Sequence, residues 1–137
     1  MIKNKPALKM ISKNKLENYE VYVIKLNDEV KKEPKFMKAN PNYKDGKPCS
    51  YVGSTKIGIK ERFRQHKTGF YNPDFKNKKG KATKWHNLYV KKYGEYLQEK
   101  QFKKLNPIQS VDDKEAKIQE AKLAEKLRKK GWGVWQN

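Results

Sequence analysis

The segment Tyr19–Leu26 constrains the fold more than any other part of the chain. It is rich in β-branched and aromatic residues and ends at Asn27-Asp28. Such residues favour extended backbone and an Asn-Asp pair favours a turn, so we expect a strand at 20–26. A second, shorter strand is expected at 50–53, where Ser-Tyr-Val stops at a glycine. We expect these two strands to form the basis of a sheet.

Three later segments space their apolar residues as helices do, and each is followed by a glycine that suits a helix end. They are 57–67, with a start at Ile57 or Ile59, then 82–93 and 111–130. The tail Trp132–Trp135 is expected to be a final strand or a packed extension. The pattern predicts an α/β fold of the α+β kind, with a small, mostly antiparallel three-stranded sheet flanked by helices.

The other segments have the composition of loops or arms. Residues 1–18 are rich in lysine and asparagine and predict a basic N-terminal arm, and residues 19–137 are long enough for a single domain. Within this domain, 27–49 carries three prolines and a glycine among lysines, which indicates mainly loop, with one helical turn near 35–39. Segment 73–80 is expected to be a lysine-rich loop.

The charge of the chain indicates a polyanionic partner. Lys and Arg number 34 against 15 Asp and Glu, a formal net charge of +19. Such an excess destabilises a compact state by self-repulsion unless a polyanion relieves it. The lysines are spread along the whole chain, so we expect a cationic body that binds a phosphate backbone in a salt-dependent way. Lysine enrichment for solubility is the alternative interpretation.

The single cysteine, Cys49, has no partner for an internal disulfide, and no Cys/His cluster has the spacing of a zinc site. The basic N-terminal stretch lacks the uninterrupted apolar run of a signal peptide, and no later run is long enough to cross a membrane. We therefore expect a cytoplasmic protein without membrane attachment.

One constellation of residues predicts chemistry. Tyr22 and Tyr51, each on an expected strand, are ordinary when taken singly, because tyrosine is a common strand residue. The run Tyr51–Thr55, however, is followed by a helix that carries Arg62 and His66 four positions apart, on one face. A strand, a glycine turn and a helix thus bring together a phenol, a guanidinium and an imidazole.

Glu120 is the carboxylate that stands out on the last helix. Ala116, Leu123, Ala124 and Leu127 surround it at helical spacings, which places it within an apolar stripe. A buried carboxylate is costly unless it has a partner such as a metal ion. Glu115 and Glu125 are displaced from this stripe by well over a right angle around the helix axis. They are expected to be solvated.

With these residues the chain resembles the GIY-YIG nuclease superfamily over roughly 19–137, with an insertion at about 27–49 outside the resemblance. Glu20–Ile24 resembles the first signature, with Glu20 where the family has glycine, and Tyr51–Gly53 resembles the second. The stretch of nearly thirty residues between Tyr22 and Tyr51 is much longer than the family's hairpin. For the family's late asparagine the candidates are Asn137 and, less well placed, Gln136.

The resemblance implies a metal-dependent endonuclease that hydrolyses phosphodiester bonds of DNA. Glu120 would hold one Mg²⁺ or Mn²⁺ ion per site, and Arg62 would stabilise the charge that develops on the phosphate. Tyr22 would position or deprotonate water and Tyr51 would orient the phosphate, or the two would exchange roles. His66 would shuttle a proton or hold a phosphate, or it would merely be bonded at the helix end. A catalytic phenol must either be acidified by neighbouring cations, which the basic surroundings are expected to supply, or work within a hydrogen-bonded water chain.

Substrate contacts are expected from basic side chains near this helix, from the lysine-rich segments Lys76–Lys84 and Lys91–Lys104, and from the N-terminal arm as a further candidate. The candidates are Lys56, Arg64, Lys67, Lys84 and Lys91. Among the nearby aromatic residues Phe70, Tyr71 and Tyr89 either stack on bases or belong to the core, and Trp85 is assigned to the core. The expected partner is DNA, with RNA left open, and the protein is a monomer or homodimer. The alternative function is a non-catalytic, basic nucleic-acid-binding protein.

Overall fold

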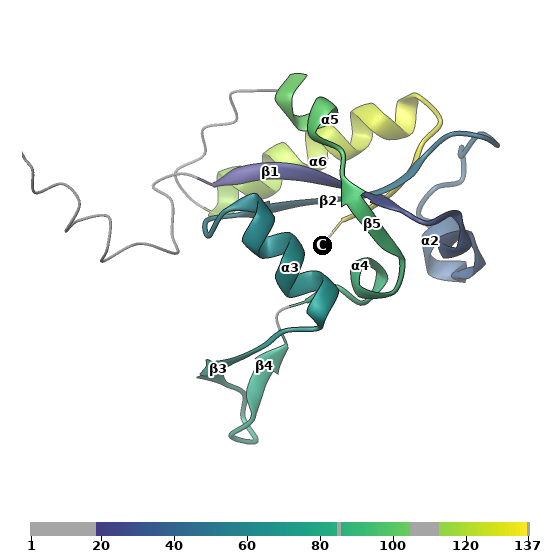
Figure 1. The fold of residues 1–137 in the computed structure, drawn as a ribbon. Helices are drawn as coiled ribbons and strands as arrows, with labels where there is room; N and C mark the ends of the chain where they lie inside the picture. The colour runs from purple at the N-terminus through teal and green to yellow at the C-terminus, as the bar shows by residue number, and fades with distance from the viewer. Residues whose placement is uncertain (1–18, 85, 105–112, 137) are drawn as a thin grey trace, which may run out of the picture.

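The structure is a computed structural model that describes residues 19–84, 86–104 and 113–136. Its centre is a four-stranded sheet in the order β5-β1-β2-β6 (Figure 1). The strands are β1 (Glu20–Leu26), β2 (Cys49–Thr55), β5 (Gly94–Leu97) and β6 (Gly133–Gln136). β1 pairs antiparallel with β2 and β5, and β2 pairs parallel with β6. The α+β class is confirmed, but the expected three-stranded, mostly antiparallel sheet is wrong, because β5 adds an edge and β6 runs parallel.

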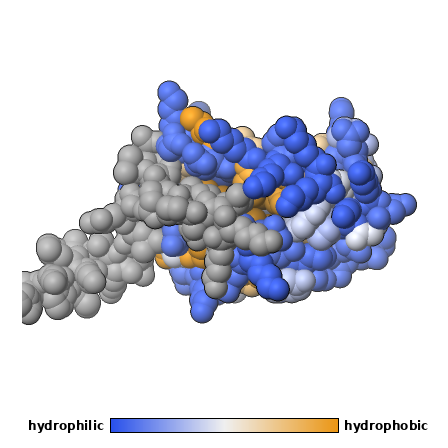
Figure 2. Space-filling model, turned by 90° about the horizontal axis from the view of Figure 1, so that it is seen from above, coloured by the Kyte–Doolittle hydropathy of each residue, from blue (hydrophilic) through white to orange (hydrophobic). Residues whose placement is uncertain are grey.

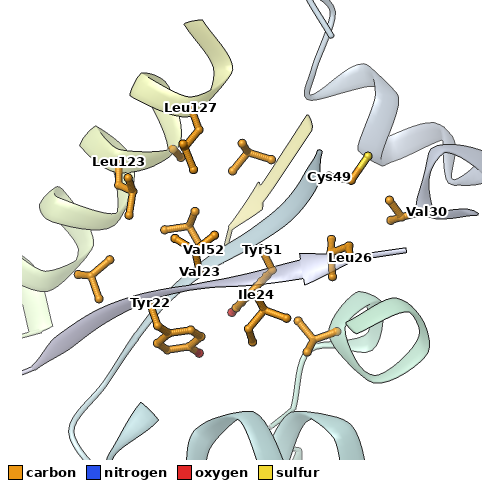
Figure 3. Packing of buried hydrophobic residues seen from close by; sticks show 14 of the residues in the cluster. Tyr22, Val23, Ile24, Leu26, Val30, Cys49, Tyr51, Val52, Leu123 and Leu127 are labelled. Atoms are coloured by element: carbon orange, nitrogen blue, oxygen red, sulfur yellow. The ribbon is translucent and has the colours of Figure 1, made fainter. Parts of the chain in front are cut away.

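Helices lie on both faces of this sheet. They are the 3₁₀ helix η1 (Asp28–Lys32) and the α-helices α2 (Pro34–Lys38), α3 (Ile59–Thr68), α4 (Leu88–Tyr93), α5 (Glu99–Lys104) and α6 (Asp113–Lys129). The surface seen from above is largely hydrophilic (Figure 2). The apolar side chains are gathered between the sheet and the helices (Figure 3).

The alternation of side chains along β1 and β2 divides the core into two halves. Val23 and Val52 face α6, where they lie against Leu123 and Leu127 (Figure 3). Tyr22, Ile24 and Tyr51 point to the opposite side, toward α3. Because successive strand residues point to opposite faces, the two tyrosines share a face through the pairing of Tyr22 with Gly53.

Segment 27–49 is part of the core. The helical turn expected near 35–39 is confirmed by α2, and η1 precedes it. Val30 of η1 and Phe36 of α2 are fully buried. Segment 27–49 therefore contributes apolar side chains to the same core as the sheet.

The prediction of a helix at 82–93 is wrong in its first half. Residues Ala82–Lys84 form strand β4, which pairs with β3 (Tyr71–Lys76) in a separate two-stranded sheet. The helix begins only at Leu88, because the side chain of Asn87 accepts hydrogen bonds from the main-chain N–H groups of Tyr89 and Val90 and caps it. The β3–β4 hairpin extends away from the rest of the molecule (Figure 1).

The loop expected at 73–80 is wrong in its first half, because β3 extends through Lys76 by pairing with β4. The remaining expected helices and strands agree with the structure. α3 ends at Gly69, whose φ of +70° is the left-handed conformation of a helix cap. α6 and the final strand β6 are confirmed, and Trp132 and Trp135 pack partly buried against the core. The basic arm 1–18, Trp85 and Asn137 lie outside the described residues. Within the described ranges, no helix has the length and apolar character needed to cross a bilayer.

Candidate active site

Tyr22 and Tyr51 lie side by side in the half of the core that faces α3. Their ring centroids are 6.2 Å apart, and both side chains are buried. Gly53 is opposite Tyr22, and a Cβ added there would lie 2.6 Å from Tyr22 Oη and 2.8 Å from Tyr51 Cε2. Only glycine leaves room for this pair, so the glycine of the Tyr-Val-Gly run is explained by packing against the two phenols.

His66 connects α3 to the first phenol. Its Nε2 lies 3.0 Å from Tyr22 Oη, and its Nδ1 accepts a hydrogen bond of 2.9 Å from the main-chain N–H of Asn87. Since Nδ1 is an acceptor, the proton of the neutral ring is on Nε2, and Tyr22 Oη accepts that proton's hydrogen bond. The phenolic hydrogen of Tyr22 is then left for another acceptor.

Burial keeps His66 and both phenols neutral. It lowers the pKa of His66 to about 3, with further contributions from the charges of Arg62 and His86. It raises the pKa of Tyr22 and of Tyr51 well above the usual value, and the opposing charge of Arg62 is the smaller effect. The expectation of an acidified phenol is therefore wrong, because desolvation outweighs the neighbouring cation.

Arg62 is half-buried at the edge of an open pocket of about 600 Å³. Its Nη1 donates to Gln65 Oε1 at 3.0 Å, which orients the guanidinium along α3. The pocket lies where β2 ends and α3 begins. Its lining includes Ser54, Lys56, Arg62, His66, Lys84 and Asp113. With three strong cations and one carboxylate among these side chains, the pocket is suited to an anionic group.

Glu120 reaches the same end of the sheet from the other face. The residue is only 1% exposed, on the helix that packs opposite α3. Glu120 Oε2 accepts a hydrogen bond from Ser54 Oγ and lies 3.7 Å from Lys117 Nζ. Oε1 is buried and has no hydrogen-bond partner among the described residues. Burial raises the pKa of this carboxyl group, against the effect of the Ser54 hydrogen bond.

The sheet separates the helices that carry Arg62 and Glu120. On one face His66 of α3 bonds to Tyr22, and from the other face Glu120 of α6 bonds to Ser54. The charges of Arg62 and Glu120 shift the pKa of Tyr22 and that of Tyr51 in opposite directions, and both effects are smaller than that of burial. Among the described residues, Arg62, Ser54 and His66 line the pocket, whereas Glu120, Tyr22 and Tyr51 do not.

One oxygen of the Glu120 carboxylate has the character of a ligand for a hard cation. Glu120 Oε1 is an unpaired, buried carboxylate oxygen, the kind of atom that a cation would stabilise. Mg²⁺ needs only one or two carboxylates because it keeps several waters. No group of three or more His, Cys, Asp or Glu side chains suited to a metal occurs in 19–84, 86–104 or 113–136. Glu120 could therefore act as a ligand for such an ion.

Two residues near Glu120 were missed by the sequence analysis. Ser54, next to the glycine of the second signature, donates to the carboxylate and lines the pocket. Asp113 also lines the pocket, and its charge acts on the pKa of Glu120. Asp113 and Glu120 are seven positions apart, so they share a face of α6. That spacing was a signal in the sequence for a second carboxylate.

The expected nucleic-acid contacts divide into two groups. Lys56 and Lys84 line the pocket. Arg64 instead makes a two-pronged ion pair with Glu61, at 2.9 and 2.6 Å. Lys67 Nζ donates to the main-chain oxygen of Gly94 at 2.8 Å, and the side chain of Lys91 lies over Gly69. Arg64 and Lys67 thus have partners within the fold, and none of these three side chains lines the pocket.

Some aromatic residues near the pocket are exposed, and others belong to the core. Tyr71 is 53% exposed and stacks edge-on against His86, with ring centroids 5.3 Å apart. Tyr89 packs against Trp135, with centroids 4.8 Å apart, so it belongs to the core. His86 lines the pocket, and because its Nδ1 lies 3.1 Å from the carbonyl oxygen of Phe70, that nitrogen carries the proton. The sequence offered no motif around His86 that would have singled it out.

Comparisons of the chain with protein-family models, with curated proteins and with solved structures returned no match.

Proposed function

We propose that the chain is a metal-dependent endonuclease of the GIY-YIG type that hydrolyses phosphodiester bonds of DNA, as a cytoplasmic monomer or homodimer. The observation that carries this proposal is that His66 of α3 lies 3.0 Å from Tyr22, beside Tyr51, at the end of the sheet where Glu120 of α6 bonds to Ser54. These side chains come from β1, β2, α3 and α6, so their convergence is a property of the fold. An open pocket lined by Arg62 and Ser54 adjoins them.

The residues that line the pocket and those buried beside it have distinct proposed roles. Arg62 binds the phosphate through two parallel donors and stabilises the charge that develops during cleavage. Tyr22 and Tyr51 act as neutral hydrogen-bond donors that orient the phosphate or a water molecule, since burial opposes a resting phenolate. His66 holds Tyr22 in place. Glu120, with Asp113 nearby, would hold Mg²⁺, which supplies a Lewis acid for the phosphate and a more acidic water.

The test of catalysis is nicking of supercoiled plasmid DNA in Mg²⁺. We expect the wild-type protein to nick the plasmid and Arg62→Ala and Glu120→Ala to be inactive. Arg62→Lys should also lose activity, about tenfold or more, because lysine cannot make the two-pronged phosphate contact. Equal nicking by all of these proteins would point to a contaminating nuclease and would remove the support for a catalytic role.

Glu120→Gln separates metal binding from folding. In the wild-type protein the buried carboxylate of Glu120 has an oxygen without a hydrogen-bond partner among the described residues. In the absence of metal, the neutral amide of the variant should therefore raise the free energy of unfolding by about 1 kcal/mol. Mg²⁺ should raise the melting temperature of the wild-type protein and leave that of Glu120→Gln unchanged, because only a ligand of the folded state stabilises it. Differential scanning fluorimetry with and without Mg²⁺ checks both. An equal Mg²⁺ effect on the two proteins would count against Glu120 as the metal ligand.

The second candidate function is a non-catalytic, basic nucleic-acid-binding protein. The deep burial of Glu120, Tyr22 and Tyr51 favours it, because reacting groups must reach the substrate. In this case the wild-type protein would bind DNA without nicking it, and Mg²⁺ would not change its melting temperature. The plasmid and melting experiments therefore distinguish the two functions.

A further inference from the structure

The β3–β4 hairpin concentrates positive charge on a projecting element. Lys76, Lys78, Lys79 and Lys81 are all exposed around its turn, and Lys84 ends its second strand. No acidic residue occurs between Phe75 and Lys84. The hairpin points away from the sheet and helices (Figure 1). Among the described residues, none of these lysines makes an ion pair.

The turn of the hairpin is held in one shape by Asn77. Its Oδ1 accepts hydrogen bonds from the main-chain N–H groups of Lys79 and Lys81, at 2.8 and 3.1 Å. The N–H of Asn77 donates to the carbonyl oxygen of Lys81 at 2.8 Å, and that of Gly80 to the carbonyl oxygen of Asn77 at 2.9 Å. Gly80 has a φ of +76°, which favours glycine. Because the backbone is already ordered, binding a ligand would not require ordering the turn.

The base of the hairpin adjoins the candidate active site. Lys84 lines the pocket, as does His86, which comes shortly after β4. Tyr71, the first residue of β3, contacts the ring of His86. A backbone held by the hairpin would therefore continue toward Arg62 in the same pocket.

We propose that the β3–β4 hairpin enters the major groove of a B-form DNA duplex and guides the adjacent strand into the pocket. A two-stranded ribbon fits the major groove of B-form DNA, which is about 12 Å wide. The major groove of A-form RNA is too deep and narrow for such an element. This inference rests on the proposed function and adds to it a preference for duplex DNA over duplex RNA.

The test compares two variants that each remove the same number of positive charges. In the hairpin variant Lys76, Lys78, Lys79 and Lys81 are replaced by glutamine. In the control variant the exposed residues Lys122, Lys126 and Lys129 of α6, and Lys130 directly after it, are replaced by glutamine. Fluorescence anisotropy measures binding of DNA and RNA duplexes of the same sequence over a range of salt concentrations. EDTA is present, so the result does not depend on cleavage.

We expect the wild-type and control proteins to bind the DNA duplex more tightly than the RNA duplex. The hairpin variant should bind DNA about tenfold or more weakly. The slope of its log K against log salt should be shallower by up to about 0.9 for each phosphate that it no longer neutralises. It should also show no preference for DNA. Equal weakening of binding in the two variants, or no preference in the wild-type protein, would overturn the proposal.

The outcome for the hairpin is separate from the outcome for catalysis. If the plasmid is never nicked and only the hairpin variant fails to bind the DNA duplex, the nuclease function fails and the groove-binding role stands. If the plasmid is nicked and the two variants bind alike, the nuclease function stands and the role of the hairpin fails.

Discussion

At the scale of single residues, His66 links the packing of the core to the candidate chemistry. Its two ring nitrogens contact Asn87 and Tyr22, and no part of the side chain is exposed. A protonated ring would lose the hydrogen bond from Asn87, because Nδ1 would then be a donor. The neutral ring is therefore the form that the folded chain stabilises.

The preference of the folded chain for the neutral ring of His66 predicts that its stability depends on pH. The pKa of His66 is about 3 in the folded chain, against an ordinary value of 6.5. Below about pH 6.5 the unfolded chain binds a proton that the folded chain does not bind, so the free energy of unfolding falls as the pH falls toward 3. The slope from this group is at most about 1.4 kcal/mol per pH unit.

Urea unfolding of the wild-type protein and of His66→Asn, at pH values of about 7, 6 and 5, measures this slope. Asparagine does not titrate, and its side-chain oxygen replaces Nδ1 as the acceptor for Asn87. The variant is expected to be less stable at pH 7 and to approach the wild type as the pH falls. If the free energy of unfolding of the two proteins decreases in parallel as the pH falls, His66 is not the group responsible.

At the scale of elements, Asn40 closes the free edge of the sheet. Its Nδ2 donates to the carbonyl oxygen of Val134 at 3.0 Å, and its Oδ1 accepts from the N–H of Val134 at 2.8 Å. The side-chain amide thus occupies the place of a peptide group in a further strand beside β6. Phe36 and Arg128 also bond to Asn40. One buried amide therefore joins α2, β6 and α6, and the exposed edge of β6 is shortened.

Asn40→Ala should lower the free energy of unfolding by about 2–3 kcal/mol, because it leaves several buried polar groups without partners. The exposed neighbour Asn42 offers a matched control, since Asn42→Ala removes the same amide two residues away. Chemical denaturation of both variants measures the difference. A similar, small effect of both substitutions would show that the amide of Asn40 is not needed at the sheet edge.

At the scale of the whole molecule, the charge of +19 opposes folding and favours a polyanion. Sodium chloride screens the repulsion, so it should raise the melting temperature of the free protein. At low salt, a short DNA duplex in the presence of EDTA should also raise the melting temperature. Added salt should reduce this DNA-dependent increase, because it weakens the complex.

Differential scanning fluorimetry over a salt series, with and without the duplex, measures both effects. Opposite salt trends are expected for the free protein's melting temperature and for the extra stabilisation by DNA. A melting temperature of the free protein that falls with salt would contradict self-repulsion as the dominant charge effect.

Local composition was sufficient for the elements whose pattern is strong. The β-branched and aromatic run predicted β1, the apolar stripe predicted α6, and Gly69 marked the end of α3. The same stripe predicted that Glu120 would be buried, and the structure confirms it. Each of these features depends on residues within a few positions of one another, so it can be seen without the rest of the chain.

Other features depended on contacts between segments far apart in the sequence. The four residues of β5 become a strand by pairing with β1, and β6 runs parallel to β2 because α6 intervenes. Ser54 and Asp113 became visible as neighbours of the pocket only in the folded chain.

The sequence by itself therefore determined the charge of the molecule, the main strand and helices, and the types of side chain available for phosphate chemistry. Only the tertiary structure decided that the pKa values of Tyr22 and Tyr51 are raised and that of His66 is lowered, because these shifts depend on burial by elements from distant parts of the chain. It also decided which lysines line the pocket and which bond to the backbone. The physical reason is that propensity acts between neighbours in sequence, whereas desolvation and charge act between neighbours in space.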